Sequence, residues 1–195
     1  MKENKRDIRA LSKEELRVFF ESIDDKAFRG NQVYEWLWNK GAHTFEEMTN
    51  LSKETRKHLE DHLVINHIQV DQIQKSDDGT IKNAVRLHDN LVVESVLIPT
   101  PKRTTACVSS QVGCSLDCKF CATAKLKRMR NLNPDEIYDQ VVAIDRESRL
   151  YFDKPLTNIV FMGMGEPLMN YNNVLKAIDK ITSPEGLGMS PKRIT

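Results

Sequence analysis

The chain has 195 residues, of which 39% are hydrophobic and 29% charged, and its formal net charge is +1. This composition is that of a soluble globular protein and excludes a disordered or fibrous chain. No run of about 18 apolar residues is present for a transmembrane helix. The charged N-terminus also lacks the apolar segment of a secretory signal. We therefore expect a cytoplasmic protein with no membrane partner, whose four cysteines stay reduced.

Residues 1–66 predict a small helical module without a catalytic constellation of its own. Ser12 and Glu15 form a capping-box pattern at the start of one helix. A second helix is expected to end near Gly41, and Ser52 can cap a third.

Residues 67–100 predict strands joined by tight turns. Turn signals at 77–79 and 89–90 separate three apolar stretches, which is typical of β-hairpins. The stretch 91–99 contains one carboxylate, Glu94. From the residues alone, this side chain is expected on the solvent face of an edge strand.

Residues 101–195 alternate between strand and helix signals. A capping Asn followed by Pro and two acids begins a helix at 133–136. The buried strand expected at 157–162 ends in the glycine-rich segment 163–167, and another helix follows. This order predicts an α/β fold with a parallel sheet. Residues 191–195 read as the opening of a further strand, so we expect the chain to be truncated relative to the complete protein.

The spacing of three cysteines, Cys114, Cys118 and Cys121, carries the strongest chemical signal. Three thiolates leave one iron of a 4Fe–4S cluster without a protein ligand, and substrate chemistry can take place at such an open position. Cys107 could instead supply the fourth ligand of a closed zinc site. A zinc-stabilised, non-catalytic RNA-binding module therefore remains an alternative, as does a non-catalytic fragment that folds poorly.

The segment from Lys119 to Arg130 carries five basic residues and no acidic one. Such a run near a reactive site suits a polyanionic substrate. A solvated loop without a binding role explains the same pattern equally well.

The cysteine spacing resembles that of the radical S-adenosylmethionine (SAM) superfamily, and Gly163–Pro167 resembles the superfamily motif that meets the SAM amino group. The resemblance implies a partial (βα)6 barrel that follows the helical module and the β-hairpin segment. It also implies a 4Fe–4S cluster and S-adenosyl-L-methionine as cofactors. The metal ligands would be Cys114, Cys118 and Cys121, and the SAM contacts Gly165 and Glu166.

A closer resemblance, to the RlmN/Cfr family of RNA methyltransferases, covers nearly the whole chain. The segments that carry it are 28–33, 45–51, 106–114, 118–123 and 163–170. This similarity implies methylation of adenosine C2 in 23S rRNA and in tRNA through a methylcysteine intermediate. A Cfr-like methylation of C8 is the alternative within the family.

The family pattern implies roles for two further residues. Glu94 matches the proton acceptor, which replaces the solvent-face interpretation, and Cys107 matches the cysteine that resolves the protein–RNA crosslink by forming a disulfide. The methyl-accepting cysteine would lie beyond Thr195, so residues 1–195 alone are not expected to methylate RNA. The family further implies an electron donor such as flavodoxin, a monomer, and RNA contacts from the helical module and the basic run.

Overall fold

The structure is a computed structural model that describes residues 5–195. The chain forms two compact units. The first contains the residues up to Asn66 together with Ser183–Gly188, and the second contains His67–Thr182 and Met189–Thr195. No helix in the described part of the chain is long and apolar enough to cross a membrane.

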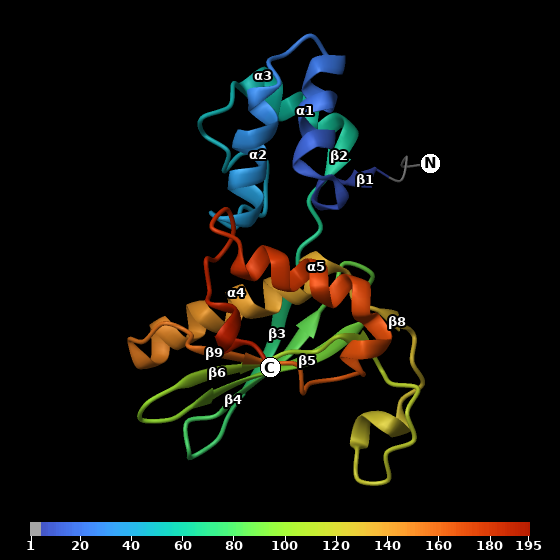
Figure 1. Cartoon of the computed structure of the whole chain (residues 1–195), viewed down its shortest axis with the longest axis vertical. Helices are drawn as coiled ribbons and strands as arrows, with labels where there is room; N and C mark the ends of the chain where they lie inside the picture. Colours follow the sequence, from blue (N-terminus) through green and yellow to red (C-terminus); the bar gives the residue numbers. More distant parts are fainter. Residues whose placement is uncertain (1–4) are drawn as a thin grey trace. The chain divides into compact units, whose positions relative to one another are not determined.

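The first unit is built from short helices and one small parallel pair of strands (Figure 1). Its elements are β1 (Arg6–Asp7), η1 (Ile8–Ala10), α1 (Lys13–Ser22), α2 (Phe28–Trp38), α3 (Lys53–His62) and β2 (Leu63–Val64). Its most buried apolar side chains include Ile8, Leu16, Phe20, Val33, Leu37, Met48 and Leu59.

Local capping determines where these helices begin. The Ser12 side chain accepts a hydrogen bond from the Glu15 backbone and the Glu15 side chain accepts one from the Ser12 backbone, which confirms the predicted capping box. Ser52 caps α3 as predicted. At the α1–α2 contact, a Cβ on Gly30 would lie 2.6 Å from the Arg17 nitrogen, so only glycine fits this close approach.

The second unit contains a five-stranded sheet in the order β3-β4-β5-β6-β9. The strands of this sheet are β3 (Gln69–Lys75), β4 (Ile81–Arg86), β5 (Val92–Pro99), β6 (Thr104–Cys107) and β9 (Asn158–Val160). Two further strands of the unit, β7 (Gln111–Val112) and β8 (Arg130–Asn131), form a separate pair. Its helices are η2 (Ala122–Lys125), α4 (Pro134–Phe152), η3 (Pro167–Asn170), α5 (Tyr171–Thr182) and η4 (Pro191–Arg193).

The sheet is mixed rather than wholly parallel. β3, β4, β5 and β6 pair antiparallel, whereas β6 and β9 pair parallel. Residues 67–100 and the later strands thus share one sheet. Ile194 forms a parallel bridge with Ile159, so the last residues do begin to pair with β9 as a further strand.

Helices α4 and α5 lie together over one face of this sheet (Figure 1). The predicted start of α4 is confirmed, with a capping box at Asn133 and Pro134 in the first turn. The helix continues to Phe152 and stops at Asp153, which has φ 51°. The core beneath the two helices contains Ile68, Val85, Leu87, Val93, Val112, Leu132, Ile137, Met164, Val174 and Ala177.

Candidate active site

Two loops meet at one edge of the sheet, because each follows one of the adjacent parallel strands β6 and β9. The Val108 amide donates to the Val160 carbonyl at 3.0 Å, and the Gly163 amide donates to the Val108 carbonyl at 3.1 Å. The Ser110 amide donates to the Met164 carbonyl at 2.9 Å. The segment that leads to the cysteines is therefore bonded directly to the glycine-rich segment.

The two glycines of this segment are required by chain packing. A Cβ on Gly163 would lie 2.7 Å from the Val108 carbonyl group. A Cβ on Gly165 would lie 2.5 Å from the Gln111 Cβ, and Gly165 also has φ +92°, which disfavours other residues. Small residues here bring Glu166 close to the start of the cysteine loop.

The cysteine loop is residues 113–129, and it is closed at its base by a narrow neck. Strands β7 and β8 pair there, with Gln111 opposite Asn131. The Met129 amide donates to the Val112 carbonyl at 2.8 Å. Figure 1 shows this loop, in yellow, extending away from the sheet. The neck fixes both ends of the loop while its middle stays outside the core.

The three predicted metal ligands, Cys114, Cys118 and Cys121, are half-buried free thiols on this loop. Backbone N–H groups of Ala124 and Thr123 lower the pKa of the Cys121 thiol. Within residues 5–195, no three His, Cys, Asp or Glu side chains are gathered closely enough to hold a metal ion. The donor chemistry nevertheless suits an iron–sulfur cluster with one open iron, since three thiols share one loop.

Cys107 is positioned differently from the other three cysteines. It lies on β6, between Val96 of β5 and Val160 of β9. Burial raises the pKa of its thiol, and a backbone hydrogen bond with Met162 opposes this only in part. Cys107 thus belongs to the sheet, whereas the other three cysteines belong to the cysteine loop.

Glu94 and Cys107 lie on the same face of the sheet, on neighbouring strands, and this face is opposite the one that α4 covers. The expectation that Glu94 belongs to an edge strand is wrong, because β5 lies between β4 and β6. The Glu94 side chain is 49% exposed, and its carboxylate pairs with Lys82 Nζ at 2.5 Å. The structure thus places a carboxyl group and a thiol on one surface.

The basic run is less cationic than its sequence suggests. Arg130 forms two 2.7 Å bonds with the buried Glu136 and a 2.6 Å ion pair with Asp89. The hydrogen bonds that Arg130 donates to these carboxylates raise its pKa, chiefly through Glu136. Lys119 is paired with Asp117 at 2.8 Å. Arg130 is therefore engaged by two carboxylates. Within residues 5–195, the exposed cations of the run that carry no acidic partner are Lys125, Lys127 and Arg128.

Sequence reasoning missed the side chains that join the two loops. Gln111 is fully buried and its Oε1 accepts a 2.9 Å hydrogen bond from the Glu166 amide. Gln140 of α4 is equally buried, and it bonds both the N–H and the C=O of Ser109. Amide side chains give no pattern in the sequence, so no local signal could have revealed these contacts.

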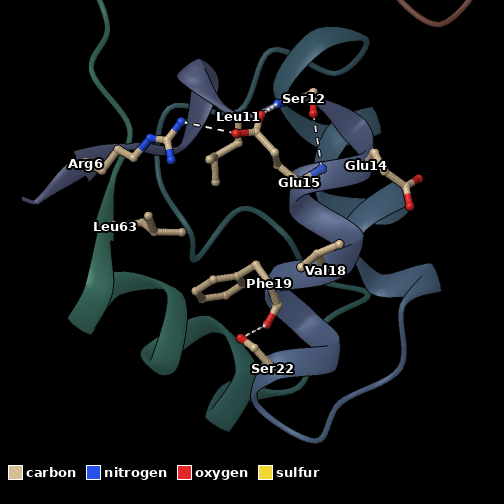
Figure 2. Close-up of a pocket in the computed structure, with 9 residues that line it drawn as sticks. All are labelled: Arg6, Leu11, Ser12, Glu14, Glu15, Val18, Phe19, Ser22 and Leu63. Carbon is tan, nitrogen blue, oxygen red and sulfur yellow. Dashed lines mark hydrogen bonds and ion pairs between the residues drawn. The ribbon is translucent and has the colours of Figure 1, made fainter.

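A hollow of about 640 Å³ in the first unit lies between α1 and the β1–β2 pair (Figure 2). Phe19 and Leu63 line its apolar part, and Glu15 stands at its rim, paired with Arg6 at 3.4 Å. These residues include no nucleophile or set of metal ligands. The chemistry-bearing residues therefore lie in the second unit.

Two family descriptions match separate parts of the chain. Residues 6–65 match the ribosomal RNA large subunit methyltransferase N-terminal domain. Residues 108–191, which include the cysteine loop and the glycine-rich segment, match the radical SAM superfamily.

Individual relatives match over the whole chain. A probable dual-specificity RNA methyltransferase RlmN from Christiangramia forsetii is 78% identical over 195 residues, which are 100% of this chain and 55% of the relative. The corresponding protein of Flavobacterium psychrophilum is 77% identical, over 100% of this chain and 56% of its own. A solved structure, a radical SAM methyltransferase from Sphaerobacter thermophilus, is 36% identical with a TM-score of 0.84, over 97% of this chain and 55% of that one. The chain thus spans about half the length of the relatives it matches.

Proposed function

Because the chain belongs to the RlmN family of radical SAM methyltransferases, we propose that it forms part of an enzyme that methylates C2 of an adenosine in 23S rRNA and in tRNA. The cofactors that belong to this family are a 4Fe–4S cluster and SAM. When bound, they supply radical chemistry, which suits a ring carbon too electron-poor to attack a methyl group directly.

One observation carries the proposal: the cysteine loop and the glycine-rich segment are bonded together at the carboxyl ends of β6 and β9. Cys114, Cys118 and Cys121 would hold the cluster. Gly165 and Glu166, on the adjoining segment, would contact SAM, with the Glu166 carboxylate facing its cationic amine. A ligand held by both groups would bridge the two loops.

The shared face of Glu94 and Cys107 suits the later steps. Glu94 would accept the proton from the ring carbon, a role that needs a base within hydrogen-bond reach. Its side chain is 49% exposed on this face, beside Lys82. The Cys107 thiolate would attack the sulfur of the methyl-carrying cysteine and form a disulfide. The bond from that sulfur to the transferred carbon would break, the carbon would keep the electron pair and take up a proton, and the RNA would be released. That cysteine is not among the four of residues 1–195.

The partners follow from the same proposal. Residues 1–66 would contact RNA as an accessory module, residues 67–100 would connect it to the barrel portion 101–195, and Lys125, Lys127 and Arg128 would contact phosphates. The enzyme would act in the cytoplasm as a monomer and receive electrons from a donor such as flavodoxin.

Anaerobic reconstitution of the full-length protein with iron and sulfide tests the proposal. We expect about four irons per chain, an EPR signal of the reduced protein that changes on adding SAM, and 2-methyladenosine in treated 23S rRNA and tRNA. Formation of 8-methyladenosine would favour the Cfr-like alternative. A colourless, air-stable protein with one zinc would contradict the radical mechanism and favour an RNA-binding module.

A further inference from the structure

We propose that Gln111 and Asn131 form an amide lock that holds the cysteine loop in register with the SAM-contacting segment. The inference rests on the proposed function and assigns Gln111 as a positioning residue for SAM. Neither amide side chain carries a role in the chemistry described above.

The lock is centred on the buried Gln111 side chain. Its Oε1 accepts from the Glu166 amide at 2.9 Å, and its Nε2 donates to Asn131 Oδ1 at 2.7 Å. Both ends of the Gln111 amide are thus used, and each contacts a different segment. Gln111 is 0% exposed, so water cannot replace either bond without opening the site.

Asn131 continues the connection on the other side of the neck. Its Nδ2 donates to the Met169 carbonyl at 3.2 Å, and its Oδ1 also accepts from Arg128 Nη1 at 3.2 Å. Residues 111 and 131 flank the cysteine loop, whereas Glu166 lies in the glycine-rich segment and Met169 follows it. Two amides therefore tie both ends of one loop to two points of the other.

Packing makes this connection stiff. A Cβ added to Gly165 would lie only 2.5–2.8 Å from the Cβ, Cγ and backbone nitrogen of Gln111. Gln111 therefore lies directly against the Gly165 backbone, with no gap between them. The cysteine loop cannot shift along the segment without displacing the Gln111 side chain.

Such rigidity matters because SAM would have to reach two groups at once. One is an iron held by the cysteine loop, and the other is the 165–166 segment. A misplacement of about 1 Å can lower a rate on the order of 100-fold when two groups must act on one ligand. The cysteine side chains themselves lie outside the neck, so loosening the lock should affect the response to SAM rather than cluster assembly.

Two substitutions in the full-length, anaerobically reconstituted protein test the lock. Gln111→Glu keeps an acceptor for the Glu166 amide but places a carboxylate oxygen against Asn131 Oδ1. Asn131→Asp removes the donor to the Met169 carbonyl. Because Asn131 is less buried than Gln111, this variant is less prone to misfold. The control is Thr104→Val, which removes a buried 2.6 Å bond to the Pro155 carbonyl at the opposite end of β6.

We expect both lock variants to bind as much iron as the unmodified protein. The SAM concentration that half-converts the EPR signal should rise at least about 10-fold in each, and it should be unchanged in Thr104→Val. An unchanged SAM titration in Gln111→Glu and Asn131→Asp, or loss of iron from them, would overturn the lock. If the unmodified protein binds no cluster or does not respond to SAM, the proposed function itself fails, and the lock fails with it.

Discussion

Arg130 and Glu136 face each other through two parallel N–H···O bonds of 2.7 Å. This pair joins the strand that leaves the cysteine loop to the first turn of α4. The Glu136 carboxylate also accepts the Asn133 amide at 2.8 Å and so completes the capping box. Its side chain is only 3% exposed, and Arg130 supplies two charge-assisted bonds to it, while His88 Nδ1 lies 3.2 Å from the carboxylate.

Replacing Arg130 with Met should be strongly destabilising, because it removes the guanidinium that is bonded twice to the buried Glu136 carboxylate and leaves the His88 ring nitrogen, 3.2 Å away, beside it. A loss of about 3 kcal/mol or more is expected in the free energy of unfolding, measured by urea denaturation. The matched control is Arg149→Met, whose 2.8 Å pair with Asp145 lies at the surface, and it should cost less than about 0.5 kcal/mol. Equal losses in the two variants would contradict the structural role of Arg130.

Replacing Gly165 with Ala should be more damaging than the same change at Gly188. Both have positive φ, +92° and +63°, which costs a non-glycine residue about 1 kcal/mol. An added Cβ meets Gln111 at 2.5 Å in the first case and nothing within 4 Å in the second. We therefore expect a further loss of about 1–3 kcal/mol for Gly165→Ala, measured by thermal or urea unfolding. Similar losses at the two sites would show that Gln111 moves aside freely.

Replacing Glu147 with Gln should stabilise the protein at neutral pH. Burial raises the pKa of Glu147 above its ordinary 4.5, although hydrogen bonding to Asn83 and the charge of Lys75 oppose this. The native state therefore holds its proton more tightly than the unfolded chain, and stability falls as pH rises through the folded pKa. The added amide also places a donor beside Asn83, whose buried Oδ1 has no hydrogen-bond partner among the described residues.

The pH dependence of Glu147→Gln separates these two effects. The gain from removing the charge should be present at pH 7, shrink as pH falls through the raised folded pKa, and vanish below 4.5, where both states of the unmodified protein are protonated. Urea midpoints of the two proteins, measured between pH 4 and 8, follow this difference. A difference that stays constant over that range would show that the charge of Glu147 does not matter.

Cysteine substitutions should divide the four thiols into two classes. Cys118→Ala should lower the iron bound after anaerobic reconstitution, because it removes one of three ligands on the loop. Cys107→Ala should leave the iron content unchanged, since Cys107 lies on β6. Metal analysis measures both. Loss of metal from Cys107→Ala, together with bound zinc, would support the four-cysteine site instead.

The parts of the fold that depend on local chemistry could be predicted from the sequence. The capping boxes at Ser12 and Asn133 and the hairpin turn before β4 are examples, since each is decided within a few residues. The cysteine spacing likewise predicted one loop carrying three thiols. In each case the interacting groups are near neighbours in the chain.

The missed features depend on contacts between distant segments. Alternating residues on β5 indicate which face Glu94 occupies, but not that β6 continues the sheet beyond it. The sequence around Arg130 does not indicate that Asp89, in the turn between β4 and β5, is its partner. Gln111 and Glu166 are 55 positions apart. Only the assembled fold determines such partners.

The β7–β8 pair places the cysteine loop outside the hydrophobic core, so we expect this unit to fold without bound metal. The sheet, the two helices and the core beneath them are complete without any side chain of residues 114–121. In a zinc finger, by contrast, metal binding supplies the free energy of folding. We expect a chelator to strip iron from this protein without unfolding it. A cell could then deliver, lose and replace the cluster many times on the same folded molecule.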